Sequence, residues 1–169
     1  MALPRKLKNF NLFVNGTSYV GEVTEVTLPK LTRSTEDYRA GGMPGPVKVD
    51  TGIEALELQW KVAGYLAELI TQWGISTVDG VLLRFAGALQ ADDFTTVDSL
   101  EVVVRGFHSE MDPGTAKAGD MTEIQFTSAV SYYKLSINGI AKIEIDMVNR
   151  IHVVDGTDLL ADVRTAIGL

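Results

Sequence analysis

Hydrophobic and polar residues alternate with a period of two along most of this chain. Between residues 56 and 62, leucine, tryptophan and valine take every second position, and Glu57, Gln59 and Lys61 lie between them. A period of two is typical of a strand that buries one face against a core. The same pattern predicts strands at 80–89, 100–108 and 141–147, and a longer extended segment at 121–137.

The segment 121–137 is expected to offer one face to a core and the other to water. The first face would hold Ile124, Phe126, Val130 and Tyr132, and the second Glu123, Gln125, Thr127, Ser131 and Tyr133. On the returning strand, Glu144 and Asp146 alternate with isoleucines in the same way. The alternation separates two faces, but it does not say what each face meets.

Turn-forming dipeptides connect several of these strands. Asn138-Gly139 separates 121–137 from 141–147, and Asn15-Gly16 follows a short apolar run near the start. Asn-Gly is favoured in two-residue hairpins because both central residues need a positive φ. The polar segment 91–96 is expected to be another hairpin loop, so neighbouring strands should pair antiparallel.

Two helices are predicted beside the strands. The first is marked by Leu66, Leu69, Ile70 and Trp73 at helical spacing, with Gly74 where a glycine commonly ends a helix. The second, near the end of the chain, would be capped by Thr157 or Asp158 and would close at Gly168. Its apolar stripe would consist of Leu159, Leu160, Val163 and Ile167.

A glycine- and proline-rich stretch at 39–46 predicts a long loop, which we extend over 39–55, within one domain rather than between two. The expected organisation is therefore a single domain, 1–169, of the mainly β (α+β) class. Its architecture should be an antiparallel β-sandwich or barrel with one packed helix and a C-terminal helix.

Composition narrows the classes of function. Hydrophobic residues form 46% of the chain and charged residues 22%, which suits a packed core and excludes a disordered chain. The absence of cysteine excludes disulfides and thiolate metal sites, and a net charge of -7 disfavours a surface that grips nucleic acid. No apolar run approaches the ~18 residues of a membrane helix, so we expect no stable membrane association.

Candidate chemistry is sparse. His108 and His152 stand in no metal-ligand spacing and beside no nucleophile, so both are interpreted as structural or exposed. Glu110 and Asp112 could share a proton or hold a cation, but a solvated strand end explains them better. Gly41-Gly42 lacks the spacing and lysine of a phosphate loop. We therefore predict no enzyme, no metal and no cofactor.

Several short sequence motifs occur in a characteristic order along the chain. They are Leu28-Pro29-Lys30-Leu31, Tyr38-Arg39-Ala40-Gly41-Gly42-Met43, Arg84-Phe85, Val103-Val104-Arg105-Gly106, Ser131-Tyr132-Tyr133-Lys134-Leu135, Ile143-Glu144-Ile145-Asp146 and Ile167-Gly168-Leu169. This ordered set resembles the major tail tube proteins of P2-like contractile-tailed phages and the tube proteins of R-type pyocins. The resemblance extends from Leu12 to Leu169.

The resemblance implies a structural subunit of a hollow tube. Members of the family form hexameric rings that stack inside a contractile sheath, and the tube becomes the conduit through the target cell envelope. The implied partners are other copies of the chain, the sheath protein, the baseplate or tube initiator and the tail terminator, and DNA would pass through without specific binding in a phage. The implied location is a virion tail or bacteriocin particle assembled in the bacterial host cytoplasm.

The resemblance also suggests where the contacts lie. The candidates for contact between subunits or rings are Tyr38, Arg39, Gly41, Gly42 and Met43, with Met43 expected to protrude. The candidates for the channel wall are Glu123, Gln125, Thr127, Glu144 and Asp146. Two other classes of function stay open: a small ligand-binding β-barrel, and a hydrolase that uses Glu110 and Asp112.

Overall fold

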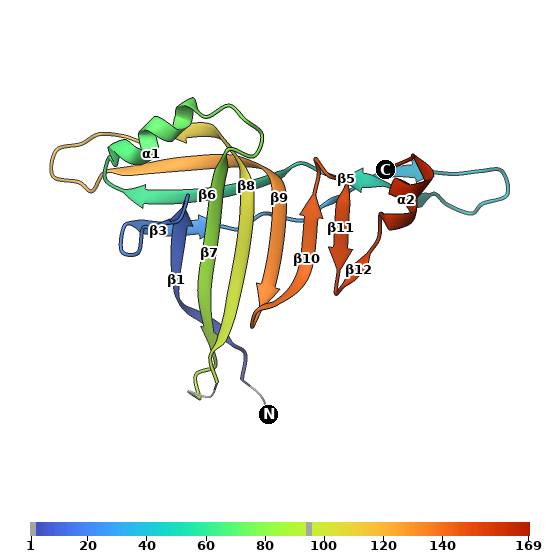
Figure 1. Ribbon diagram of the computed structural model, residues 1–169, viewed down its shortest axis with the longest axis horizontal. Helices are drawn as coiled ribbons and strands as arrows, with labels where there is room; N and C mark the ends of the chain where they lie inside the picture. Colours follow the sequence, from blue (N-terminus) through green and yellow to red (C-terminus); the bar gives the residue numbers. More distant parts are fainter. Residues whose placement is uncertain (1–2, 94–95) are drawn as a thin grey trace.

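The computed structural model describes residues 3–93 and 96–169, and within them the chain forms two packed β-sheets that share their longest strands, and a separate two-stranded hairpin (Figure 1). What we call the front sheet contains β1 (Lys6–Val14), β2 (Thr17–Ser18), β7 (Val81–Gln90), β8 (Asp98–Asp112), β9 (Glu123–Ile137), β10 (Ile140–Asp146), β11 (Ile151–Val154) and β12 (Thr157–Asp158), in the order β12-β11-β10-β9-β8-β7-β1-β2. All their pairings are antiparallel. The predicted mainly β, antiparallel class is confirmed. The predicted loop 91–96 lies partly outside the described residues.

What we call the back sheet is formed by β3 (Val23–Thr27), β6 (Leu56–Ala63), the first half of β9 and the last part of β8, in that order. In Figure 1 its strands run across those of the front sheet. β8 and β9 each bend near the middle, so one part of each strand lies in the front sheet and the other part lies in the back sheet. The fold is therefore a β-sandwich with two strands continuous from one layer to the other.

The bend depends on Gly106 of β8 and Ser131 of β9. Arg105 pairs with Tyr132 and Gly106 pairs with Val130, so Ser131 is an extra residue, a β-bulge. A Cβ atom at position 106 would lie 1.8 Å from the carbonyl oxygen of Ala129, so only glycine permits this approach. The Ser131 hydroxyl donates to the carbonyl oxygen of Val78 at 2.7 Å.

The bulge changes the phase of the alternation along β9. Ile124, Phe126 and Val130 face the core, as predicted. Beyond Ser131 the prediction was wrong, because Tyr133 is buried in the core, whereas Tyr132 lies on the outer face. One extra residue reverses the direction of every side chain that follows it.

The core between the two sheets centres on an aromatic stack. The rings of Trp60 and Phe126 lie 4.6 Å apart, and the His108 ring lies 5.1 Å from Phe126. Trp60 Nε1 donates to the Ser128 hydroxyl at 3.3 Å, and His108 Nδ1 lies 2.9 Å from the same oxygen. Burial lowers the pKa of His108 to about 4, so this histidine is neutral and structural, in line with its predicted role.

Residues 39–55, predicted as a loop, are only partly irregular. β4 (Arg33–Tyr38) and β5 (Val47–Ile53) pair antiparallel as a separate two-stranded hairpin, and only 39–46 and 54–55 lie between strands. We call this hairpin the arm; it extends away from the sandwich in Figure 1. The prediction missed β5 because its side chains are mostly exposed, so it lacks the half-buried alternation that marks other strands.

The helices are shorter than predicted. α1 (Ala67–Thr71) continues into a 3₁₀ turn, η1 (Gln72–Gly74), and buries Leu69 while leaving Trp73 half exposed. α2 (Ala161–Ala166) starts later than expected, because Asp155-Gly156 forms a hairpin turn and Thr157 and Asp158 form β12 instead of a cap. The apolar stripe of α2 is largely exposed rather than packed. No helix in the described part of the chain has the length and apolar character needed to cross a membrane.

Candidate functional site

The outer face of the back sheet is polar and acidic. We call this surface the acidic face, and its members are Glu25, Thr27, Glu57, Gln59, Lys61, Glu110, Asp112, Glu123, Gln125 and Thr127. It carries five carboxylates and one lysine. The register places all of them on one side, because each pair of opposite residues shares a face and the other side holds the core residues Leu58, Trp60 and Phe126.

Lys61, the single cation of the acidic face, forms an ion pair within that face. Lys61 Nζ lies 3.0 Å from a carboxylate oxygen of Glu25, and the hydrogen bond to that group, followed by its charge, raises the pKa of Lys61. The Thr24 hydroxyl donates to Glu123 at 3.4 Å. The surface therefore presents carboxylates, amides and hydroxyls to water, and its net charge is negative.

Both edges of the back sheet are open. Within the described residues β3 pairs only with β6, and the segment of β8 after Gly106 pairs only with β9, because the pairing of β7 ends at Gly106. Each edge therefore exposes unpaired backbone N–H and C=O groups, which readily pair with a strand of another chain.

The front sheet protects its edges differently. β2 and β12, which flank it, have two residues each, and β1 contains a register shift at Lys8. Lys6 and Lys8 hold Asp92 at 2.5 and 2.6 Å, and these hydrogen bonds lower the pKa of Asp92 to about 2. Short edge strands, bulges and lysines all discourage strand addition. The basic residues near the start of the chain are thus bound to Asp92, in the loop that follows β7.

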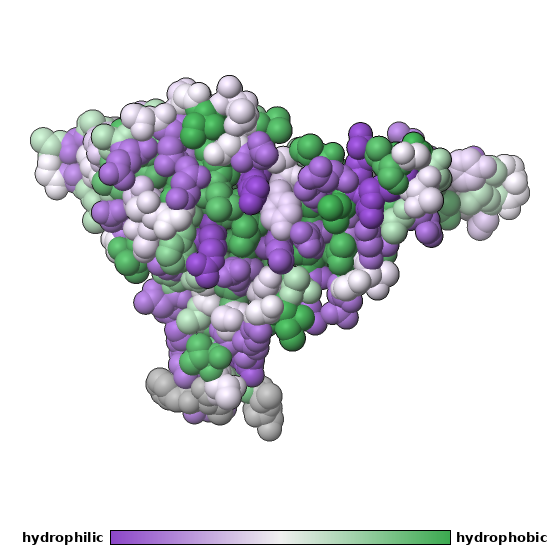
Figure 2. Space-filling view, in the orientation of Figure 1, coloured by the Kyte–Doolittle hydropathy of each residue, from purple (hydrophilic) through white to green (hydrophobic). Residues whose placement is uncertain are grey.

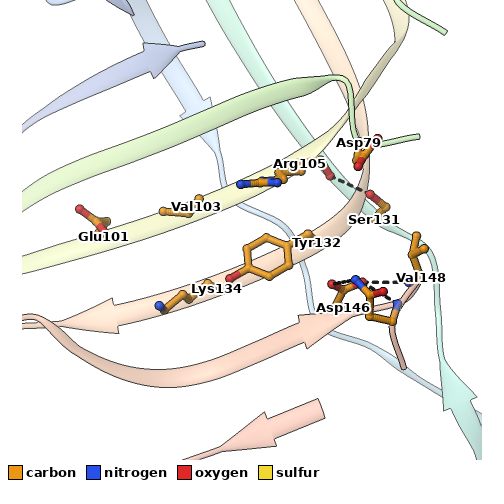
Figure 3. A pocket seen from close by; sticks show the side chains of 10 residues that line it. Asp79, Glu101, Val103, Arg105, Ser131, Tyr132, Lys134, Asp146 and Val148 are labelled. Atoms are coloured by element: carbon orange, nitrogen blue, oxygen red, sulfur yellow. Dashed lines mark hydrogen bonds between the residues drawn. The ribbon is translucent and has the colours of Figure 1, made fainter. Parts of the chain in front are cut away.

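The outer face of the front sheet contains a shallow groove of about 370 Å³ (Figure 3). Arg105, Tyr132 and Lys134 lie along it, with the Arg105 guanidinium carbon 5.9 Å from the centre of the Tyr132 ring. The Tyr132 hydroxyl donates to Glu144 at 2.8 Å, and burial, together with this carboxylate, raises the pKa of Tyr132 to about 12. Figure 2 shows hydrophilic and hydrophobic residues interspersed over the same side of the molecule.

The five candidates for the channel wall fall on two different surfaces. Glu123, Gln125 and Thr127 belong to the acidic face, whereas Glu144 and Asp146 lie on the front sheet. Glu144 accepts from Tyr132, and Asp146 accepts from the backbone N–H groups of Val148 and Asn149, which shapes the turn after β10. Glu110 and Asp112 were singled out from the sequence only as candidates for a cation site or a hydrolase. The remaining acidic-face residues were not singled out, although Glu57, Gln59 and Lys61 alternate visibly in β6.

The arm has two different faces. On one face Arg33 contacts Asp50 at 2.7 Å and Lys48 contacts Asp37 at 3.2 Å. On the other face Tyr38 lies opposite Val47, and Val49 follows on the same side, opposite Glu36. Tyr38, Val47 and Val49 are 56%, 49% and 46% exposed, which leaves an apolar strip in water.

At the tip of the arm, the predicted contact residues form a closed turn. The Met43 N–H donates to the Ala40 carbonyl at 3.2 Å, and the Ala40 N–H contacts Met43 Sδ at 3.1 Å. Gly42 has φ +85°, which glycine adopts freely, and Gly41 faces open space. Met43 is only partly exposed, so it folds back on the turn instead of protruding. Tyr38 and Arg39 are the members of the set with large exposed side chains, and Gly41 and Gly42 are exposed as well.

The alternative functions find little support in this arrangement. Asp112 accepts from the Gly114 N–H at 2.9 Å, and Glu110 lies exposed on the acidic face, so the two carboxylates do not converge on an enclosed site. The described residues contain no group of histidines and carboxylates that could hold a metal ion. Trp60, Phe126 and His108 fill the space between the sheets that a ligand-binding barrel would leave open.

The described residues thus form an antiparallel sandwich whose back sheet has one acidic face and two open edges. Residues 4–168 match the family model described as phage tail tube protein FII. The chain belongs to this family of phage tail tube proteins. The resemblance to tail tube proteins, inferred from the order of the sequence motifs, is therefore confirmed.

Relatives and one solved structure agree with this membership. The tail tube protein of Escherichia phage P2 is 44% identical over 172 residues and covers all of both chains, and the major tail tube protein of Serratia phage KSP20 is 43% identical, covering 100% of this chain and 99% of its own. A chain of the sheath–tube complex of an extracellular contractile injection system, in its extended state, shares the fold with a TM-score of 0.60 at 15% identity, covering 79% of this chain and 91% of that one. The solved structure shows the shared fold, and the family membership makes this chain a structural subunit of a tail tube.

Proposed function

We propose that six copies of this tail tube protein close into a ring, and that the rings stack into a hollow tube inside a contractile sheath. The tube is the conduit through the envelope of the target cell and, in a phage, the passage for DNA. The observation that carries the proposal is the back sheet, since one layer combines a polar acidic face with two open edges.

Ring closure follows from the direction of the strands. Neighbours in the order β3-β6-β9-β8 are antiparallel, so β3 runs opposite to the end of β8. When the open edge of β3 in one copy pairs with the end of β8 in the next, the antiparallel pattern continues without interruption. Repetition of this heterologous contact closes a ring, and no exposed edge remains.

The acidic face then lines the channel, and the core lies outside it. DNA carries one phosphate charge for about every 1.7 Å of duplex, so a wall of lysines would hold it through many weak contacts. Carboxylates repel phosphates, and neutral amides and hydroxyls hold them only weakly, so the DNA can slide through the channel. In this arrangement Glu123, Gln125 and Thr127 face the channel, together with the other residues of the acidic face, and Glu144 and Asp146 face away from it.

The front sheet and its groove face outward in the same arrangement, where the sheath encloses the tube. The solved neighbour of the same fold comes from a sheath–tube complex, which supports this orientation of partners. The tube initiator of the baseplate and the tail terminator would meet its two ends. The chain performs no covalent chemistry in this role, because its work is to assemble and to keep a pore open. Its place is the tail of the particle, assembled in the host cytoplasm.

The first test is size-exclusion chromatography of the purified protein, followed by negative-stain electron microscopy at increasing concentration. Six-fold rings or hollow tubes are the expected result. Rings of a different symmetry would refute the hexamer, and a protein that stays monomeric even with its baseplate initiator would refute assembly altogether.

A disulfide test addresses the edge contact directly, because the chain contains no cysteine. Glu25 and Glu110 lie near the middle of the two open edges, and within one copy β6 and β9 separate them by three inter-strand spacings, about 14 Å. A disulfide spans Cα atoms no more than about 7 Å apart. Oxidation of the double variant Glu25→Cys/Glu110→Cys should therefore link different copies, with a ladder on non-reducing gels that ends at the ring. Each single variant is the control and should give dimers at most.

A further inference from the structure

Two Asn-Gly turns of the front sheet are built in the same way. Asn15-Gly16 joins β1 to β2, and Asn138-Gly139 joins β9 to β10. The two asparagines have positive φ angles of 48° and 51°, as a two-residue hairpin turn requires. The antiparallel order β9-β8-β7-β1 sends β1 and β9 in opposite directions, so the turns lie at opposite ends of the sheet. All four turn residues are exposed to water.

Each asparagine also binds the neighbouring strand through two hydrogen bonds. The Asn15 N–H donates to the Leu82 carbonyl at 2.8 Å, and Asn15 Oδ1 accepts from the Leu82 N–H at 2.9 Å. Asn138 makes the same two contacts with Ser99, both at 2.9 Å. The side-chain carbonyl thus takes the place of a backbone carbonyl and holds the turn against the sheet.

The side-chain amide nitrogens of the two turns have different surroundings. Asn138 Nδ2 donates to one carboxylate oxygen of Asp98 at 2.9 Å, and Arg5 forms an ion pair with the other oxygen. The Asn138 amide is therefore held at both of its ends. Asn15 Nδ2 has no hydrogen-bond partner in the part of the chain that the structure describes, so this amide is held through Oδ1 alone.

The Asn-Gly dipeptide is chemically reactive in water. Its glycine nitrogen is unusually accessible, because glycine has no Cβ atom to shield it. In deamidation this nitrogen loses its proton to water and attacks the asparagine Cγ atom. A C–N bond forms, the Cγ–Nδ2 bond breaks, and ammonia leaves with a proton taken from water. Water then opens the cyclic imide, at Cγ to give aspartate or at the backbone carbonyl to give isoaspartate.

The other candidates for this reaction are less reactive. The remaining asparagines, Asn9, Asn11 and Asn149, precede phenylalanine, leucine and arginine, whose side chains shield the attacking nitrogen. Asp155-Gly156 forms a third turn with positive φ at both residues. Its side chain is a carboxylate, which is a poorer electrophile than an amide. The Asn-Gly turns are therefore the two sites to compare.

We propose that Asn15-Gly16 is the principal site of spontaneous deamidation in the folded protein, and that Asp98 protects Asn138-Gly139. To reach the glycine nitrogen, the Asn15 amide gives up one hydrogen bond, whereas the Asn138 amide gives up two. The second of these bonds is made to a charged group, and such bonds are the stronger ones. Deamidation at Asn138 should therefore be slower by roughly tenfold. The modification belongs to the single chain and does not depend on ring closure.

The rates at the two asparagines can be compared within one sample. Purified folded protein is incubated at mildly alkaline pH, and the deamidated and isoaspartate-containing peptides are then measured by digestion and mass spectrometry. Asn15 should react roughly ten times faster than Asn138. The same incubation in urea is the matched control, because unfolding removes the hydrogen bonds and the two dipeptides should then react at similar rates.

Three results would overturn the proposal. The first is a rate at Asn138 that equals or exceeds the rate at Asn15 in the folded protein. The second is a ratio of rates in urea as large as the ratio in the folded protein, because the difference would then come from the local sequence. The third is an unmodified Asn15 in folded protein after a time that converts it in urea.

A substitution tests the protective role of Asp98 separately. Asp98→Ala should raise the rate at Asn138 roughly tenfold, toward that at Asn15. Asp120→Ala, which removes an exposed carboxylate from the loop between β8 and β9, is the control and should change neither rate. An unchanged rate at Asn15 in the Asp98→Ala sample shows that the variant is folded. An unchanged rate at Asn138 in that sample would refute protection by Asp98.

Discussion

Gly106→Ala is expected to be among the most damaging single substitutions in the sandwich, because it acts where β8 and β9 bend. The added Cβ atom would lie 1.8 Å from the Ala129 oxygen, 2.8 Å from its carbonyl carbon and 3.2 Å from the Val130 Cα atom. These are all backbone atoms of the neighbouring strand, so no side chain can rotate out of the way. The Cβ atom and the Ala129 oxygen must move apart by about 1.6 Å, from 1.8 Å to 3.4 Å, to reach an ordinary van der Waals contact.

The expected cost follows from that displacement. Overpacking in a well-packed interior costs about 1–3 kcal/mol, and separating the strands weakens roughly two ladder hydrogen bonds at about 1 kcal/mol each. We therefore expect Gly106→Ala to lower the free energy of unfolding by about 3–5 kcal/mol. With an m-value of about 2 kcal/mol/M in urea, the unfolding midpoint should fall by about 2 M.

Urea unfolding followed by tryptophan fluorescence measures this change, because Trp60 is buried in the core and becomes exposed on unfolding. Gly45→Ala is the matched control, since its Cβ atom meets open space and its φ lies outside the positive region. The control should stay within about 0.5 kcal/mol of the wild type. A midpoint for Gly106→Ala as close to the wild type as that of the control would refute the close approach of the two strands.

Three further predictions concern the core and the channel. The pKa of His108 is about 4 in the folded protein and about 6.5 in an unfolded chain. The unfolded chain therefore binds the extra proton in this window, and the free energy of unfolding should fall by about 2 kcal/mol between pH 7 and pH 5. His108→Leu should lose that part of the pH dependence in urea titrations at the two pH values, and an unchanged slope would contradict the neutral buried state. Phe126→Ala, which removes the centre of the aromatic stack, should cost about 3–5 kcal/mol in the same assay, whereas a loss below 1 kcal/mol would show that the stack does not organise the core. Tubes assembled from Glu57→Lys/Glu123→Lys should retain fluorescent single-stranded DNA at low salt and release it at high salt, whereas wild-type tubes and the outward-facing control Glu144→Lys should not retain it in their channel.

The sequence predicted the half-buried strands and the Asn-Gly turns, because both depend on residues that are neighbours along the chain. Alternation identified β6, β8, β9 and β10, because a half-buried strand must place apolar side chains at every second position. Asn15-Gly16 and Asn138-Gly139 occupy positive φ, as their turn type requires. Asp155-Gly156 carries the same signal, so the hairpin of β11 and β12 could have been predicted from it.

Other features depend on contacts between distant residues, and no local pattern contains them. Gly106 meets Ala129, and the bulge at Ser131 exchanges the roles of Tyr132 and Tyr133, although both tyrosines have the same character in the sequence. A glycine within an alternating strand is a signal for such a bend, but it does not name the partner strand.

The family, the half-buried strands and the Asn-Gly hairpin turns could be recognised in the amino-acid sequence, because each depends on residues close together along the chain or on their order. The grouping of the polar residues was decided by the tertiary structure. Because β8 and β9 each bend from one sheet into the other, Glu123, Gln125 and Thr127 join Glu25, Glu57 and Glu110 on the acidic face. Glu144 and Asp146 stay on the front sheet. Alternation assigns each side chain to one of two faces, whereas the sheet to which that face belongs follows only from which strands pair.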